Sequence, residues 1–126
     1  MNTAPVKEIE SEALMDFCRR ITAMQAGGMI DIERIESDGT RERIADQATF
    51  QRVLLDQSGA CSDRLTFEFG VNGGKTNAYV ITEPIHVRLR ETENGRYKCM
   101  EIVAEDGTTV LAFRPGINPA ALQGMV

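Results

Sequence analysis

His86 is the only histidine in this chain, so it limits the acid-base and nucleophilic chemistry available. A Ser-His-Asp triad or a Cys-His dyad would have to include this residue, because each needs an imidazole as its general base. His86 alternates with Val87, which is typical of a strand residue on the outer side of a sheet. Cys99, the nearest cysteine in the expected sheet, lies several residues along the ladder. The residues therefore favour a non-enzymatic protein, and we assign no catalytic residue.

Three cysteines, Cys18, Cys61 and Cys99, have the ligand chemistry of a zinc site when they are combined with His86. Structural zinc sites usually draw their ligands from close pairs such as Cys-x-x-Cys, whereas these cysteines lie about forty residues apart. This spacing is typical of reduced, unpaired thiols. The glycine-rich run 70–75 also lacks the spacing of a phosphate-binding loop and is expected to be a hairpin turn. We therefore expect no metal and no cofactor.

One group of polar side chains differs from an ordinary solvated surface. The outer face of the expected sheet combines guanidinium groups with a tyrosine and several apolar side chains, and arginine and tyrosine are favoured at interaction hot spots. The candidate binding residues are Tyr79, His86, Arg88, Arg90, Glu101 and Arg114. A plain alternative is that Arg88 and Glu101 form a cross-strand ion pair on a surface that binds nothing. Both interpretations depend on which side chains point outwards.

The directions of these side chains follow from two tight-turn dipeptides, Asn94-Gly95 and Asp106-Gly107. They join three runs of alternating apolar and polar residues between positions 85 and 113, and a hairpin turn at each dipeptide determines a register. The first turn pairs Arg90 with Cys99, Arg88 with Glu101 and Val87 with Ile102, and the second pairs Val103 with Val110, Ile102 with Leu111 and Met100 with Phe113. Both turns predict the same buried face of the sheet. This agreement is informative because a shift of one residue in register would turn every side chain to the opposite face.

A further hairpin is expected before these two, around an Asn-Gly loop. With Gly70 opposite Lys75, the side chains of Ala78 and Val80 point inwards and that of Tyr79 points outwards. The expected apolar face then consists of Leu65, Phe67, Phe69, Ala78, Val80, Val87, Leu89, Met100, Ile102, Leu111 and Phe113. An antiparallel sheet with one such face must be covered on that side.

The cover is expected to be an amphipathic helix over about residues 11–26. Its apolar residues recur at steps of three and four and are Ala13, Leu14, Phe17, Cys18, Ile21 and Met24. Ser11 is the expected N-cap, and Gly27-Gly28 stops the helix.

The remaining segments are expected to be strands and a tail. Residues 29–35 and 41–44 are predicted to form short strands that are separated by a turn. The run 47–57 fits both a strand and a helix, and we favour a strand because the run is short for a helix. Pro115-Gly116 is expected to end the sheet, which leaves a frayed tail over residues 115–126.

Length and composition place these elements in a single domain, residues 1–126, with a β-rich region over about 29–114. A net charge of −5 repels nucleic-acid phosphates and anionic membranes, so we expect neither as a partner. The sequence shows neither a signal peptide nor a membrane span, and the expected location is the cytoplasm. The expected fold is an α+β two-layer sandwich, in which the N-terminal helix packs on one face of an antiparallel, mostly meander β-sheet.

The run HVRLRETENGRYKCMEIVAEDGTTVLAFRP, after a helix that contains Leu14-Met15-Asp16-Phe17, resembles a bacterial family of small acidic proteins known only as a domain of unknown function. The resemblance implies an N-terminal helix and strands that end in a Thr-Glu-rich hairpin and an acidic-Gly-Thr-Thr turn. It also supports a strand over residues 50–56. Members often have Trp near the helix start, where this chain has Leu14. The resemblance implies no activity, substrate or catalytic residue.

These observations favour an interaction module whose outer sheet face binds a protein partner or a second copy of the chain. The alternative is a small enzyme or anionic-ligand binder that uses the Arg88/Arg90/Arg114 cluster with His86, which would need a concave pocket beside these side chains. A third hypothesis is that the acidic surface mimics nucleic acid.

Overall fold

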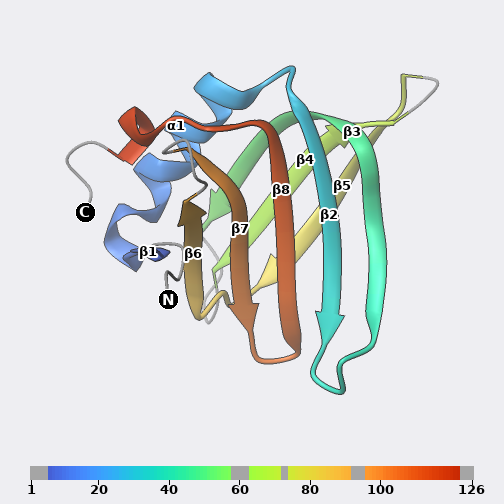
Figure 1. The fold of residues 1–126 in the computed structure, drawn as a ribbon. Helices are drawn as coiled ribbons and strands as arrows, with labels where there is room; N and C mark the ends of the chain where they lie inside the picture. Colours follow the sequence, from blue (N-terminus) through green and yellow to red (C-terminus); the bar gives the residue numbers. More distant parts are fainter. Residues whose placement is uncertain (1–5, 58–62, 72–73, 92–95, 123–126) are drawn as a thin grey trace, which may run out of the picture.

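The computed structural model describes residues 6–57, 63–71, 74–91 and 96–122. Its strands are β1 (Val6–Ile9), β2 (Met29–Glu36), β3 (Arg41–Asp56), β4 (Arg64–Gly70), β5 (Thr76–Thr82), β6 (His86–Glu91), β7 (Tyr97–Ala104) and β8 (Gly107–Ile117). Helix α1 (Leu14–Gln25) follows a 3-10 turn (Ser11–Ala13), and a second 3-10 turn (Pro119–Leu122) follows β8. The eight strands form one antiparallel sheet in the order β1-β6-β7-β8-β2-β3-β4-β5 (Figure 1). The chain is therefore an α+β protein, as predicted.

The sheet is strongly curved. Strands β5 and β6 stand six places apart in it, which corresponds to about 29 Å in a flat sheet. Only residues 83–85 join them, and a link of this length spans at most about 15 Å. Figure 1 accordingly shows β4 and β5 passing behind β2 and β8. The sheet therefore curls around its inner face, which brings the two ends of the strand order towards each other.

Helix α1 packs against β3 and β8 and closes the core. Thr22 Oγ1 accepts a hydrogen bond from the backbone N–H of Val53 at 3.0 Å, and Gln25 Nε2 donates to the carbonyl oxygen of Pro115 at 2.8 Å. The largest fully buried side chains are Phe17, Phe50, Phe67, Phe113, Ile21, Ile30, Ile32, Leu65, Leu89, Met100, Ile102 and Leu111. They come from the helix and from six of the strands, so one continuous core stabilises the curled sheet.

The start of the helix differs from the prediction. Ala13, and not Ser11, occupies the position before α1, and it makes no side-chain cap. The backbone N–H of Ala13 donates to the carbonyl oxygen of Glu10 at 3.0 Å, so the first turn is tightened into a 3-10 turn that begins at Ser11. Gly27, with φ of 89°, ends the helix as predicted.

Strands β6 and β7 have the predicted register from His86 to Arg90, with Arg88 opposite Glu101, but a bulge then pairs Glu91 with Tyr97. The predicted turn at Asn94-Gly95 lies outside the described residues. The register between β7 and β8 differs from the prediction by two residues, because Ala104 pairs with Gly107 and Ile102 pairs with Thr109. A shift of two residues keeps every side chain on its face. The predicted buried face of these strands is therefore correct although the predicted turn is not.

The predicted register of β5 is wrong by one residue. Val71 donates its N–H to the carbonyl oxygen of Lys75 at 2.9 Å, so the loop is shorter than expected and Gly70 pairs with Thr76. A shift of one residue in register turns every side chain of the strand to the opposite face of the sheet. The side chain of Val80 is consequently 48% exposed, whereas that of Tyr79 lies on the inner face.

Strand β3 and the end of β8 are both longer than expected. The separate runs predicted at 41–44 and 47–57 join into one strand, which confirms the choice of strand over helix. Residues 115–117 are not frayed, because β8 continues to Ile117, which is fully buried and pairs with Tyr97. A shift in register between Tyr97 and Cys99 accommodates Pro115, which has no N–H for the ladder. The end of the predicted tail, residues 123–126, lies outside the described residues.

Candidate outer-face interaction site

The outer face of the sheet carries charges of alternating sign from strand to strand. One row of cross-strand neighbours runs over six strands and consists of Glu8, Arg88, Glu101, Val110, Glu33 and Arg43. The row follows from the strand alternation, since Arg88 lies between the buried Val87 and Leu89, and its neighbours across the ladders point to the same side. Val110 interrupts the charges near the middle of the sheet. This row is the framework of the candidate site.

Glu8 on β1 binds two of the predicted site residues at the β6 side of the row. Its carboxylate lies 2.9 Å from His86 Nδ1 and accepts a hydrogen bond from Arg88 Nε at 3.2 Å. The His86 imidazole and then the Arg88 guanidinium hold the pKa of the Glu8 carboxyl below its usual value. His86 is therefore held by a carboxylate at the surface.

The other two arginines of the predicted cluster are also paired. Arg90 donates to the Glu101 carboxylate, and Arg114 Nη2 donates to Asp31 Oδ2 at 2.6 Å. The second carboxylate oxygen of Asp31 accepts a hydrogen bond from the backbone N–H of Gln47 at 2.6 Å. Asp31 thereby ties β8 to an irregular point of β3, where Gln47 has φ of 51°. The predicted cross-strand neighbours Arg88 and Glu101 do face each other, but their ion pairs are made with other residues.

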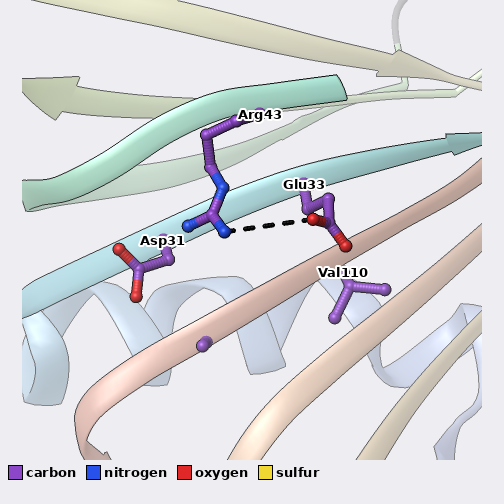
Figure 2. A pocket seen from close by; sticks show the side chains of 5 residues that line it. Asp31, Glu33, Arg43 and Val110 are labelled. Carbon is purple, nitrogen blue, oxygen red and sulfur yellow. Dashed lines mark ion pairs between the residues drawn. The ribbon is translucent and has the colours of Figure 1, made fainter. Parts of the chain in front are cut away.

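A shallow depression of about 210 Å³ lies where the row crosses β8 and β2. Val110 and Ala112 on β8 line it together with Asp31, Glu33 and Arg43 (Figure 2). The depression exists because the side chain of Ala112 is small. At the rim of the depression, Glu33 forms an ion pair with Arg43 at 4.0 Å. Figure 2 shows the guanidinium of Arg43 between the carboxylates of Asp31 and Glu33. The depression is thus apolar on the β8 side and charged on the β2 and β3 side.

The thiol beside this depression is not activated. Cys99 is the cross-strand neighbour of Ala112, and burial raises the pKa of its thiol. Burial also raises the pKa of Cys18 to about 12. Nucleophilic cysteines need the opposite shift, towards the thiolate. Both groups therefore behave as small core or surface residues.

Five of the six predicted site residues, His86, Arg88, Arg90, Glu101 and Arg114, lie on the outer face as expected. Tyr79 does not, and the cause is the one-residue register error in β5. Its hydroxyl lies 3.1 Å from Thr109 Oγ1 and accepts a hydrogen bond from Arg34 Nη1 at 3.3 Å, on the inner face. The outer-face site is therefore centred on β7, β8 and β2, without Tyr79.

A polar cluster around Arg34 on the inner side of the sheet was not predicted from the sequence. This guanidinium donates to Glu36 Oε1 at 2.8 Å and to Asp106 Oδ2 at 2.9 Å, in addition to Tyr79. The hydrogen bonds to Glu36, Asp106 and Tyr79 raise the pKa of Arg34 above its usual value. Because Arg34 has the same parity as the buried Ile32, the alternation of β2 already indicated an inward arginine. Its contact with Tyr79 could not be foreseen, because β3 and β4 separate β2 from β5 in the order of the sheet.

Comparisons with known proteins find no matching family model, no similar curated protein and no similar solved structure. In the described part of the chain, no three His, Cys, Asp or Glu side chains are grouped as a metal site would require. Within the same ranges, no helical segment has the length and hydropathy of a membrane crossing.

Proposed function

We propose that this chain is a non-enzymatic interaction module that docks a protein partner on the outer face of β6, β7, β8 and β2. The observation that carries the proposal is the depression over Val110 and Ala112, which has an apolar wall inside a field of charges of both signs. A hollow of this kind suits one large side chain of a partner, while the surrounding charges set its orientation.

The ion pairs of this face support a protein partner over an anionic ligand. Arg88, Arg90 and Arg114 each have a carboxylate neighbour, so an incoming anion would have to displace Glu8, Glu101 or Asp31. Exposed pairs of this type contribute only about 0–1 kcal/mol each, so a partner that brings its own charges can exchange them at little cost. Alternating signs also disfavour a partner that carries a single sign of charge, because some of its charges would lie opposite like charges. A partner with a mixed surface and a protruding apolar side chain fits best.

Site-specific photo-crosslinking in the cells that produce the protein tests this proposal. A photoreactive residue at Val110 is expected to give an adduct of one discrete mass, whereas the same residue at Met24 on α1 gives none. Ala112→Arg fills the depression and should remove the adduct, while Ala23→Arg, an equal change on the exposed side of α1, should leave it unchanged.

Two results would contradict the proposal. One is an adduct pattern that is the same from Val110 and from Met24. The other is an adduct from Val110 that survives Ala112→Arg in a protein whose thermal unfolding is unchanged. A partner identified by the adduct should then bind the purified chain, with an affinity that Ala112→Arg lowers by at least about tenfold.

A further inference from the structure

The two edges of the sheet differ in how they are protected. Strand β1, at one edge, has only four residues and includes Lys7 and Glu8, and short charged strands resist pairing with another chain. Strand β5, at the other edge, has seven residues, TNAYVIT, without any charge or proline. Strands of this composition present an open template for another strand. The β5 edge therefore differs from the protected edges that most proteins have.

The free hydrogen-bonding groups of β5 can be assigned from the ladder with β4. Lys75 accepts from Val71 N–H at 2.9 Å, and Glu83 donates its N–H to Asp63 at 2.8 Å. In an antiparallel pair, every second residue of a strand forms its backbone hydrogen bonds with the same neighbouring strand. The odd-numbered residues between Lys75 and Glu83 therefore form theirs with β4. The N–H and C=O groups that face away from β4 belong to Thr76, Ala78, Val80 and Thr82.

We propose that β5 pairs antiparallel with β5 of a second copy of this chain, about a two-fold axis at Tyr79. In this register Ala78 lies opposite Val80 of the second copy, and Thr76 lies opposite Thr82. Every edge-facing N–H and C=O of these four residues then has a partner. The contact is closed and symmetric, so it produces a dimer and leaves no β5 edge for further growth.

Charge complementarity selects this register among the possible ones. Centring the axis on Tyr79 brings Lys75, the residue before β5, close to Glu83 of the second copy, the residue after β5, at both ends of the contact, and this proximity of opposite charges is favourable. An axis at Ala78 or at Val80 would lose both pairs. In the described residues, neither Lys75 nor Glu83 has an ion-pair partner within its own chain.

The exposed apolar side chains beside this edge support the same pairing. Val80 is 48% exposed and Leu54 is 42% exposed, and both lie in one cross-strand row with Thr66. In the dimer Ala78 of the second copy continues this row beyond Val80, which covers part of its exposed surface. The pairing uses the β5 edge and not the outer face over β8 and β2, so this proposal and the docking proposal can fail independently.

Sedimentation equilibrium tests the dimer. The purified chain, 13.9 kDa as a monomer, is expected to approach twice that mass as its concentration rises towards about 1 mM, the range suited to a small interface. Val80→Pro removes an edge-facing N–H that has no role in the ladder with β4, and proline is tolerated at sheet edges. We expect this variant to weaken dimerisation by at least about tenfold, with an unchanged thermal unfolding midpoint.

A charge-reversal series tests the register. Lys75→Glu and Glu83→Lys should each weaken dimerisation, because each places like charges opposite each other, and the double variant should restore it. Lys98→Glu on β7 changes the net charge as Lys75→Glu does and should have no effect. A strict monomer at the highest concentration would overturn the proposal. So would a dimer that is unaffected by Val80→Pro, or single charge reversals whose effects simply add in the double variant.

Discussion

At the scale of single residues, Tyr79 links strands that a flat drawing of the sheet would keep far apart. Its hydroxyl reaches Thr109 on β8 and Arg34 on β2 across the inside of the curl. Thr109 is buried, and a buried hydroxyl that loses its partner leaves an unsatisfied group. Tyr79 is therefore a structural residue of the inner face, and the register of β5 decides this role.

Tyr79→Phe should lower the free energy of unfolding by about 1–2 kcal/mol, because it removes the hydroxyl and leaves Thr109 and Arg34 each short of one partner. Urea titration followed by circular dichroism measures the change. Tyr97→Phe is the matched control, since Tyr97 is a buried tyrosine whose hydroxyl has no hydrogen bond within the described residues. Equal losses for the two variants would show that the hydroxyl contacts of Tyr79 contribute nothing.

At the scale of elements, the turn between β7 and β8 shows what a dipeptide signal can predict. The Asp-Gly pair located the hairpin, but Gly107 lies at the start of β8 and pairs with both Ala104 and Glu36. A Cβ on Gly107 would lie 2.6 Å from the carbonyl oxygen of Ile35, and the residue has φ of 152°. The glycine is therefore required by the close approach of β2, which no feature of the hairpin sequence reveals.

Gly107→Ala is expected to lower the free energy of unfolding by about 2–3 kcal/mol, because the new methyl group overlaps the backbone of β2 in a strained conformation. Gly39→Ala provides the comparison, since Gly39 also has a positive φ, of 91°, but nothing lies within 4 Å of its added Cβ. Thermal unfolding of both variants measures the difference. If Gly39→Ala costs as much as Gly107→Ala, the approach of β2 is not the cause.

At the scale of the whole molecule, the curl of the sheet brings the two ends of the strand order towards each other, and α1 packs against β3 and β8. Strand β8 lies in the middle of the sheet order, pairs with β7 and β2, and continues past Pro115 to the buried Ile117. The carbonyl oxygen of Pro115 accepts a hydrogen bond from the side chain of Gln25, so the end of β8 is also bonded to the helix. Residues 115–117 of the segment expected to fray are thus part of the sheet, and Ile117 belongs to the core.

Ile117→Ala should cost about 2–4 kcal/mol of unfolding free energy, because it leaves a cavity in a fully buried position. Ile85→Ala is the matched control, since Ile85 is 58% exposed and its loss should cost well under 1 kcal/mol. Chemical denaturation of both variants provides the measurement. A negligible effect at Ile117 would support the frayed tail that the sequence suggested.

The sequence by itself determined the class of fold and most of the buried face. Helical steps over 13–21 and strand alternation over 86–113 are local patterns, since each residue's direction follows from its immediate neighbours and the period of the element. The same alternation placed Arg88, Arg90 and Glu101 outside, but none of the five residues that line the depression was among the candidate site residues.

Tertiary structure alone decided the register of β5, the curl of the sheet and the contact between Arg34 and Tyr79. These depend on contacts between residues far apart in the chain, and one residue in the length of a loop is enough to reverse a strand. The depression over Ala112 arises in the same way, because it needs β2 and β3 beside β8. Local periodicity fixes the face on which a side chain lies, while the length of loops and the packing of distant strands decide what that side chain meets.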